Sequence, residues 1–274
     1  MKIGFIGGGN MAQALMTGIA ARHGDATFVV IEPHAATRAT VARIVRNAAL
    51  HDVPSADLAG CDAVIIAVKP QNFREAVTAA ARWLDGPLVI SIAAGIRTSE
   101  IAHWLAHDTR PRPIVRAMPN LPALIGEGIT ALYAMAMVDT RERELAERLL
   151  SAVGQTLWVD DEATLDGVTA VSGSGPAYVF SFIEALEQGG LELGLSPEDA
   201  RRLAVATFVG ASRLASQSEE PISVLRERVT SKGGTTHAAL MHMNESGCHQ
   251  AIVRAIHAAA KRSAELGDEY GRER

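Results

Sequence analysis

Short apolar runs alternate with longer segments of helical period from residue 2 to about residue 160, and this alternation constrains the fold most. The runs are rich in valine and isoleucine. They are KIGFIG (2–7), TFVVI (27–31), AVIIAV (63–68), PLVISI (87–92) and RPIVRAM (112–118). Strands that are apolar on both faces are typical of a parallel sheet covered by helices on each side. This part of the chain therefore predicts a doubly wound α/β domain.

The later part of the chain has a different pattern, with apolar residues at helical spacing in segments 177–193, 197–216 and 246–266. Ser196, Pro197 and Asp199 match the N-cap, first-turn proline and acidic third position of a helix start. We therefore expect an all-helical second domain, with domains at residues 1–161 and 162–274 and a short helix or loop at 160–166 joining them. The final GDEYGRER (267–274) is predicted to be a frayed, charged tail.

The motif IGFIGGGNMAQAL (3–15) follows the first predicted strand and opens a helix. Gly7, Gly9 and Ala12 match G-x-G-x-x-A, in which the first glycine permits a tight turn and the second lets a pyrophosphate approach the backbone. The third position is small so that helix and strand pack closely, and free N–H groups at the helix start hold the phosphates. The motif predicts a dinucleotide site.

The second predicted strand ends at Ile31 and Glu32, where an acidic residue commonly bonds the adenosine ribose and repels a 2′-phosphate. This placement favours NADH over NADPH. Two alternatives stay open: Glu32 is solvated and has no such role, or Arg38 turns inward to bind a 2′-phosphate.

Composition and charge narrow the class of partner. The formal net charge is −5 and acidic and basic residues are mixed, so the chain has no basic stripe for nucleic acid. Cys61 and Cys248 lack a second cysteine at metal or redox spacing, and we interpret them as buried or idle thiols with no metal site. No apolar run has the length of a membrane span. We expect a cytoplasmic protein that acts on a small metabolite.

Several segments follow predicted strands, where ligands bind in open α/β sheets. AVKP (67–70) and SIAAG (91–95) fall there, and Lys69 is either a cofactor contact or an exposed loop residue. RAMPNLP (116–122) forms an irregular turn with a structural or a functional role. SGSGPAY (172–178) indicates a close-packed approach to a helix.

The stretch VTSKGGTTHAAL (229–240) places two glycines and two threonines together inside the helical part. Adjacent glycines indicate a sharp bend or a close approach of the backbone to another group. The simplest interpretation is a helix start with Thr235 or Thr236 as the N-cap.

Five motifs, GFIGGGNMAQAL, AVKPQ, RAMPNLP, SGSGPAYVF and VTSKGGTT, occur in the order and approximate spacing of pyrroline-5-carboxylate reductases, and the chain resembles this family from residue 2 to 266. The resemblance implies a Rossmann-type N-terminal domain, an all-helical C-terminal dimerisation domain, and a homo-oligomer of interleaved dimers, commonly a decamer. It implies reduction of L-1-pyrroline-5-carboxylate to L-proline with NADPH or NADH.

The resemblance also implies the site residues. The substrate site corresponds to Ser231, Gly233, Gly234, Thr235 and Thr236. The cofactor contacts correspond to Ile6, Gly7, Gly8, Gly9, Asn10, Met11, Glu32, Val68, Lys69, Pro70 and Ala94. Two positions depart from the family: Lys232 stands where many members have proline, and Glu32 stands where serine or asparagine is common. The second departure puts the common preference for NADPH in doubt for this chain.

The chemistry of a cyclic imine that carries a carboxylate suggests roles for the 231–236 loop. The backbone N–H groups of Gly233, Gly234 and Thr235 can form an anion site, and Lys232 adds positive potential. Thr236 is our candidate catalytic residue, with its hydroxyl bonded to the imine nitrogen. The imine proton comes from the bound substrate itself, from water or through Thr236. His237 is a competing general acid or a packing or surface histidine.

Three alternatives to this function are a β-hydroxyacid-type dehydrogenase, an imine reductase for another ring, and a nucleotide-binding protein without turnover. The hydroxyacid enzymes use a lysine in the long interdomain helix, and segment 177–193 contains none. A sensor has no need of a second anion site, so the 231–236 loop argues against that class.

Overall fold

The computed structural model describes residues 1–106 and 112–272. Its strands are β1 (Lys2–Ile6), β2 (Thr27–Ile31), β3 (Ala48–His51), β4 (Ala63–Ile66), β5 (Leu88–Ser91), β6 (Ile114–Met118), β7 (Gly128–Ala134) and β8 (Gly154–Trp158). Its α-helices are α1 (Asn10–Arg22), α2 (Ala35–Ile44), α3 (Phe73–Ala80), α4 (Thr98–Leu105), α5 (Thr140–Leu150), α6 (Thr164–Val168), α7 (Gly175–Glu192), α8 (Pro197–Gln217), α9 (Ile222–Arg228), α10 (Thr235–Glu245) and α11 (Cys248–Arg272).

In the described residues the strands form one eight-stranded sheet in the order β3-β2-β1-β4-β5-β6-β7-β8. The first six strands run parallel, β7 is antiparallel to β6, and β8 is parallel to β7. The order of the first six strands is that of a dinucleotide-binding Rossmann sheet. The predicted α/β class is therefore confirmed, and the five predicted apolar runs each contain a strand.

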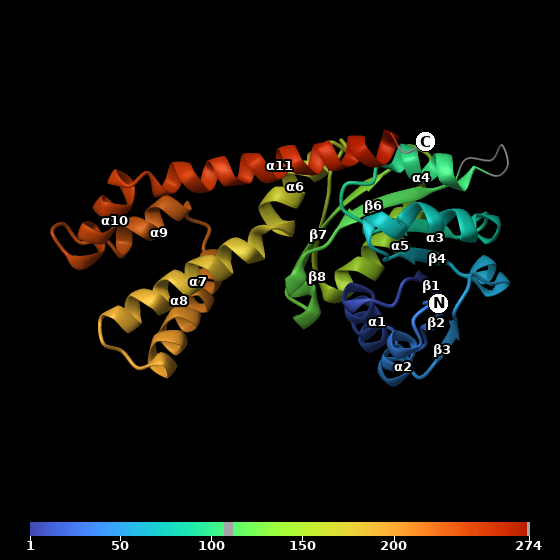
Figure 1. Cartoon of the computed structure of the whole chain (residues 1–274), viewed down its shortest axis with the longest axis horizontal. Coiled ribbons are helices and arrows are strands. Elements are labelled where there is room, and N and C mark those ends of the chain that lie inside the picture. The colour runs from blue at the N-terminus through green and yellow to red at the C-terminus, as the bar shows by residue number, and fades with distance from the viewer. Residues whose placement is uncertain (107–111, 273–274) are drawn as a thin grey trace. The chain divides into compact units, whose positions relative to one another are not determined.

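Two apolar layers cover the faces of this sheet, as Figure 1 shows for the helices beside the strands. Alternation along each strand divides the core: Ile3 and Phe5 of β1 face one layer, whereas Ile6 faces the other. Helices α1, α2 and α5 pack on the first face, and α3 and α4 pack on the second. The core thus fixes the helices that begin at the carboxyl ends of the parallel strands.

The chain forms two compact units. The first comprises residues 1–174 together with the described part of 259–274, and the second comprises residues 175–258. Within the first unit α11 returns to the α/β core, because Tyr270 packs against the layer of α3 and α4. Residues 267–272 are helical, so the prediction of a frayed tail is wrong for them. The domain division at 161/162 stays a prediction.

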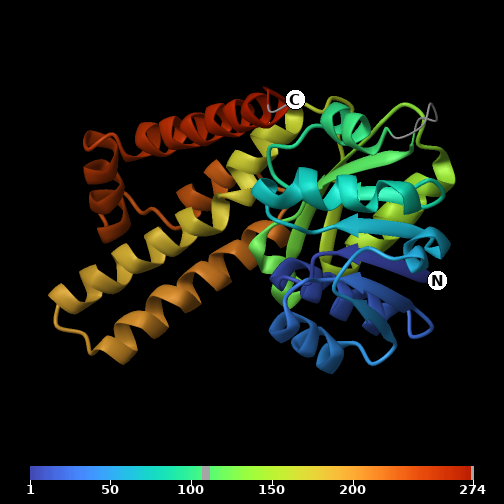
Figure 2. The same ribbon diagram turned by 45° about the vertical axis from the view of Figure 1, so that its right-hand side comes forward.

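The second unit is helical, as expected. Helices α7 and α8 pack against each other along their length, as both Figure 1 and Figure 2 show, with the rings of Phe182 and Phe208 6.3 Å apart. The predicted start of α8 is confirmed, since the Ser196 hydroxyl accepts the Asp199 N–H at 3.1 Å and Pro197 occupies the first turn. No buried residue is found on α7 within the described part of the chain.

Candidate functional site

The glycine-rich turn between β1 and α1 has the geometry that its motif predicts. Gly7 has φ +98°, and a Cβ there would lie 2.6 Å from the carbonyl oxygen of Ala67. Gly9 precedes α1 with an extended backbone, and a Cβ there would meet nothing within 4 Å. Ala12 is fully buried against the sheet. The turn is therefore tight at Gly7 and open at Gly9, as a pyrophosphate site requires.

A cleft of about 720 Å³ lies beside this turn, at the carboxyl ends of β1, β2 and β4. Among its lining residues are six of the predicted cofactor contacts and two further carboxylates. The six are Ile6, Gly7, Gly9, Glu32, Val68 and Lys69, and the carboxylates are Asp52 and Glu75. With three carboxylates and one lysine around it, the cleft is acidic.

Glu32 is 6% exposed, so the interpretation that it is solvated is wrong. One carboxylate oxygen accepts the N–H of Gly8 at 2.9 Å and the other accepts the N–H of His34 at 2.9 Å. These bonds hold the carboxylate at the end of β2 and tie it to the glycine-rich turn. The structure thus gives Glu32 a second task, bracing the turn, which the sequence did not indicate.

Arg38 lies at the same end of β2, on the first turns of α2. Its guanidinium donates hydrogen bonds to the carbonyl oxygens of Glu32 and Pro33, at 2.7 and 2.8 Å. The side chain therefore holds the backbone of this turn. Its nearness to the cleft keeps open the alternative that it binds a 2′-phosphate.

The other predicted cofactor residues are not in the lining of this cleft. Gly8 faces Glu32, Asn10 and Met11 begin α1, and Pro70 follows Lys69 directly. Ala94 lies in the loop after β5, half-buried. Asn10 instead lines a second cavity of about 360 Å³, between α1 and the 3₁₀ helix Leu121–Ile125.

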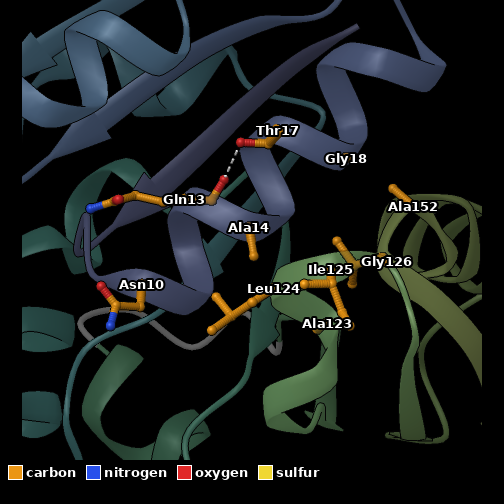
Figure 3. A pocket seen from close by; sticks show the side chains of 11 residues that line it. Asn10, Gln13, Ala14, Thr17, Gly18, Ala123, Leu124, Ile125, Gly126 and Ala152 are labelled. Carbon is orange, nitrogen blue, oxygen red and sulfur yellow. Dashed lines mark hydrogen bonds between the residues drawn. The ribbon is translucent and has the colours of Figure 1, made fainter. Parts of the chain in front are cut away.

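Figure 3 shows this second cavity, with Gln13 and Thr17 of α1 on one side and Leu124 and Ile125 on the other. The RAMPNLP segment thus lies beside the helix that begins at the glycine-rich turn. Its polar side chains have structural partners: Arg116 pairs with Glu162 at 3.1 Å, and Asn120 accepts the N–H of Ile129 at 3.0 Å. Sequence reasoning missed Leu124 and Ile125, which no motif distinguishes from core residues.

The 231–236 loop connects α9 and α10 in the second unit. Gly233 has φ +74°, and a Cβ on Gly234 would lie 2.5 Å from the Ser231 hydroxyl oxygen. Gly233 is therefore required by the backbone, whereas Gly234 is extended and a Cβ on it would chiefly meet a serine hydroxyl that can rotate away. The extended Gly234 is the N-cap of α10, and neither threonine caps the helix in this part of the described chain, so the predicted Thr235 or Thr236 cap is wrong.

One detail of the predicted anion site also needs correction. The Gly234 N–H donates to the carbonyl oxygen of Ser231 at 3.0 Å and closes the turn, so this amide is already engaged. Thr235 and Thr236 occupy the first two positions of α10, whose N–H groups have no partner within the helix. The Gly234 amide is therefore not available to an anion, whereas those of the first helical turn are. His237 is half-buried in the same turn.

Other predicted features have clear positions. Gly173 lies close to Met118, since a Cβ on it would be 2.6 Å from the methionine methyl, so the SGSGPAY segment packs tightly as expected. Cys61 is buried, and burial raises the pKa of its thiol to about 11. Among the described residues no helix is both long and apolar enough to cross a membrane.

Comparisons with known proteins agree with this arrangement. Residues 2–95 match a family described as NADP oxidoreductase, coenzyme F420-dependent, and residues 162–266 match the pyrroline-5-carboxylate reductase dimerisation family. A pyrroline-5-carboxylate reductase of Pseudomonas aeruginosa is 43% identical over 272 residues, with 98% of each chain covered.

Solved structures are similar over the same length. A pyrroline-5-carboxylate reductase of Coxiella burnetii has a TM-score of 0.88 at 35% identity and covers 96% of this chain and 97% of its own. The pyrroline carboxylate reductase of Plasmodium falciparum, crystallised with NADP, has a TM-score of 0.84 at 27% identity, with 97% and 98% covered. The chain therefore belongs to the pyrroline-5-carboxylate reductase family.

Proposed function

We propose that this protein reduces L-1-pyrroline-5-carboxylate to L-proline, the last step of proline synthesis, with NADPH or NADH as hydride donor. The observation that carries the proposal is full-length similarity to reductases of this name in a chain that keeps both glycine-dependent elements. Gly7 and Gly233 have φ +98° and +74°, which residues with a side chain rarely adopt, and a Cβ at Gly7 would also collide with the carbonyl oxygen of Ala67, just after β4. Both elements are therefore built structures and not chance matches to a pattern.

The residues of the first element fit a dinucleotide. The open space at Gly9 and the first turn of α1 suit a pyrophosphate, and the cleft extends along β2 towards Glu32 for the adenosine half. Val68, Lys69, Pro70 and Ala94 follow β4 and β5, where the nicotinamide half belongs in a sheet of this order. When bound, the cofactor supplies the hydride, and the protein supplies its orientation. Because the Glu32 carboxylate is fixed in the cleft, we propose that the protein prefers NADH to NADPH as its cofactor.

The second element holds the substrate. The N–H groups of Thr235 and Thr236 at the start of α10 bind the carboxylate, and the positive end of the helix adds to their effect. Gly233 and Gly234 shape the turn, and Ser231 closes it through its carbonyl oxygen. Lys232 is exposed and contributes positive potential at longer range.

Thr236 is the proposed catalytic residue. No side chain of this turn is used as a helix cap among the described residues, so the hydroxyl of Thr236 is free to bond the ring nitrogen of the substrate. A hydrogen bond at this atom orients the imine for attack, and the proton on the nitrogen comes with the bound substrate, from water, or from water relayed through the Thr236 hydroxyl. His237, three positions after the N-cap, is the competing proton donor.

The helical unit is proposed to form a homodimer. Helix α7 buries no residue, and its side chains Val179, Phe180 and Leu186 are 41, 52 and 49% exposed. A helix with such a surface needs a partner, and the matching family model is one for dimerisation. We propose interleaved dimers that assemble further into a decamer, which multi-angle light scattering tests directly through the mass in solution.

A spectrophotometric assay tests the function. Purified protein with pyrroline-5-carboxylate and NADH or NADPH is expected to oxidise the cofactor and to form proline in equal amounts. A simple 3-hydroxy acid with the oxidised cofactor is expected to give no rate, since α7 contains no lysine for the chemistry of β-hydroxyacid dehydrogenases. Cofactor binding with no turnover on any cyclic imine would instead indicate a nucleotide-binding protein.

A further inference from the structure

The end of α11 lies against the loop that follows β5. Two glycines meet there: a Cβ on Gly95 would lie 3.2 Å from the Cβ of Leu266, and a Cβ on Gly267 would lie 3.1 Å from the carbonyl oxygen of Gly95. Gly267 is buried, and Gly95 has φ +78°. Helix and loop therefore touch backbone to backbone, which larger side chains at either position prevent.

Polar and apolar contacts continue this interface along the helix. Asp268 pairs with Arg97, the residue before α4, at 2.9 Å. Tyr270 packs on the core layer formed with α3 and α4, and the α carbon of Gly271 faces the carboxylate of Glu100. One turn earlier, the Ser263 hydroxyl donates to Asp166 at 2.6 Å. The dimerisation family model ends at residue 266, so residues 267–272 add this contact beyond the matched region.

The opposite end of the same loop is also fixed. The carboxylate of Glu162 accepts the N–H of Thr98 at 2.7 Å and its hydroxyl at 2.8 Å, and it pairs with the buried Arg116. The loop of residues 92–97 is thus held between Glu162 on one side and α11 on the other. Ala94 lies in its middle.

We propose that Leu266, Gly267 and Asp268 of α11 position the 92–97 loop, and with it Ala94, against the nicotinamide half of the cofactor. Gly267 and Asp268 are then positioning residues: neither touches the reacting atoms, and both set the place of a loop that does. The inference rests on the proposed function, because Ala94 is a proposed cofactor contact. It assigns a positioning task to a segment of α11 that sequence reasoning interpreted as part of a frayed tail.

The decisive variant is Gly267→Ala, with Gly271→Ala as its matched control. Both changes improve the helix propensity of α11. The new methyl at 267 lies 3.1 Å from the loop, which must shift by a few tenths of an ångström, whereas the methyl at 271 makes an ordinary 3.5 Å contact. Small displacements of positioning groups reduce turnover strongly, so we expect kcat to fall roughly threefold to tenfold for Gly267→Ala only.

Three further readouts separate positioning from general damage. The Tm of Gly267→Ala should not fall, and its affinity for ADP-ribose, which lacks the nicotinamide, should stay within about twofold of the native value because the loop serves the other half. Asp268→Asn should lower kcat, and Asp268→Glu should restore it. Unchanged kcat in Gly267→Ala, or an ADP-ribose affinity that falls in parallel with kcat, overturns the proposal.

An experiment without turnover keeps the proposal separate from the proposed function. Amide hydrogen exchange of residues 92–97 is compared between the full chain and a variant that ends at Leu266. Faster exchange in this loop, with β1 and β4 unchanged, supports the contact even if pyrroline-5-carboxylate is not the substrate. Unchanged exchange in the loop contradicts it, and native protein that fails only in the reductase assay contradicts the proposed function alone.

Discussion

The backbone N–H of Gly8 donates a hydrogen bond to the carboxylate of Glu32 at 2.9 Å, and this bond joins the glycine-rich turn to the end of β2. The turn and the strand end are the two places where a Rossmann domain holds the pyrophosphate and the adenosine ribose. We propose that this single buried carboxylate links the position of the phosphates to the choice between NADH and NADPH.

Replacing Glu32 should therefore change cofactor preference. In Glu32→Ser the carboxylate no longer faces the ribose, so repulsion of a 2′-phosphate is removed and the ratio of kcat/KM for NADH to that for NADPH should fall severalfold. Glu32→Asp retains the charge and should keep a ratio closer to the native one. Steady-state kinetics with both cofactors measure the ratio. An unchanged ratio in the serine variant means that Glu32 only braces the turn.

Replacement by alanine should lower stability at Gly7 and should weaken cofactor binding at Gly9. Gly7→Ala strains a backbone at φ +98° and crowds Ala67, so unfolding free energy should fall by about 1–3 kcal/mol. Gly9→Ala meets no atom within 4 Å and should leave stability unchanged, yet it should weaken cofactor binding because the methyl occupies the place of the pyrophosphate.

Urea unfolding measures the stability of the Gly7→Ala and Gly9→Ala variants, and calorimetric titration measures their affinity for the cofactor. If Gly9→Ala binds the cofactor with native affinity, the pyrophosphate does not bind at Gly9.

These glycine positions mark what the sequence predicts well. A pattern of strand, glycines and helix is local, so the turn at Gly7 and the parallel strands around it could be predicted. The bond from Gly8 to Glu32 could not, because it joins residues that only the sheet brings together. Strands β3, β7 and β8 were missed because none is a continuous buried run of the kind used to find the others: β3 and β8 have no buried position, and half-buried Ile129 and Tyr133 interrupt β7.

The helix ends likewise divide into those that depend on neighbouring residues, which could be predicted, and those that depend on distant residues or on backbone geometry, which could not. Ser196 and Pro197 gave the start of α8 because capping depends on neighbouring residues. The start of α10 was misassigned to a threonine, since the extended backbone of Gly234 serves as cap and its amide closes a turn. The end of α11 was misassigned as frayed because its charged residues hide Gly267 and Tyr270, whose packing partners lie far away in sequence.

Thr236 should matter for turnover rather than for cofactor binding. Thr236→Ala removes one hydrogen bond to a group that carries charge in the reaction, worth about 1.5–3 kcal/mol, so kcat should fall roughly tenfold to a hundredfold. Thr236→Ser keeps a hydroxyl and should recover most of the rate. Cofactor affinity, measured by fluorescence titration, should be native in both. Native kinetics in the alanine variant would remove Thr236 from the mechanism.

The pair of Glu162 and Arg116 should contribute to stability. The Arg116 side chain is 4% exposed, so Glu162→Ala leaves a buried cation without its carboxylate and should lower the unfolding free energy by about 3 kcal/mol. Glu220→Ala, which breaks the more exposed pair with Arg228, should have little effect by comparison. Chemical denaturation of both variants tests the contrast, and equal losses would contradict it.

The thiol of Cys61 should be unreactive in the folded protein. Burial raises its pKa to about 11, so at pH 8 it stays protonated and should resist iodoacetamide until the protein unfolds. The raised pKa also makes the free energy of unfolding depend on pH, because the folded state binds the thiol proton more tightly than the unfolded state does. This contribution to stability is fully present below the unfolded pKa near 9 and is lost as the pH rises towards 11. Mass spectrometry of alkylated native and denatured protein, with denaturation curves across that range, checks both statements.

The most direct test of the account is a crystal structure of the protein with oxidised cofactor and L-proline. The account predicts that the proline carboxylate lies on the N–H groups of Thr235 and Thr236, that the ring nitrogen faces the Thr236 hydroxyl, and that the nicotinamide carbon which gives the hydride faces the proline ring. Proline bound away from the 231–236 loop, with that loop empty, would contradict the account.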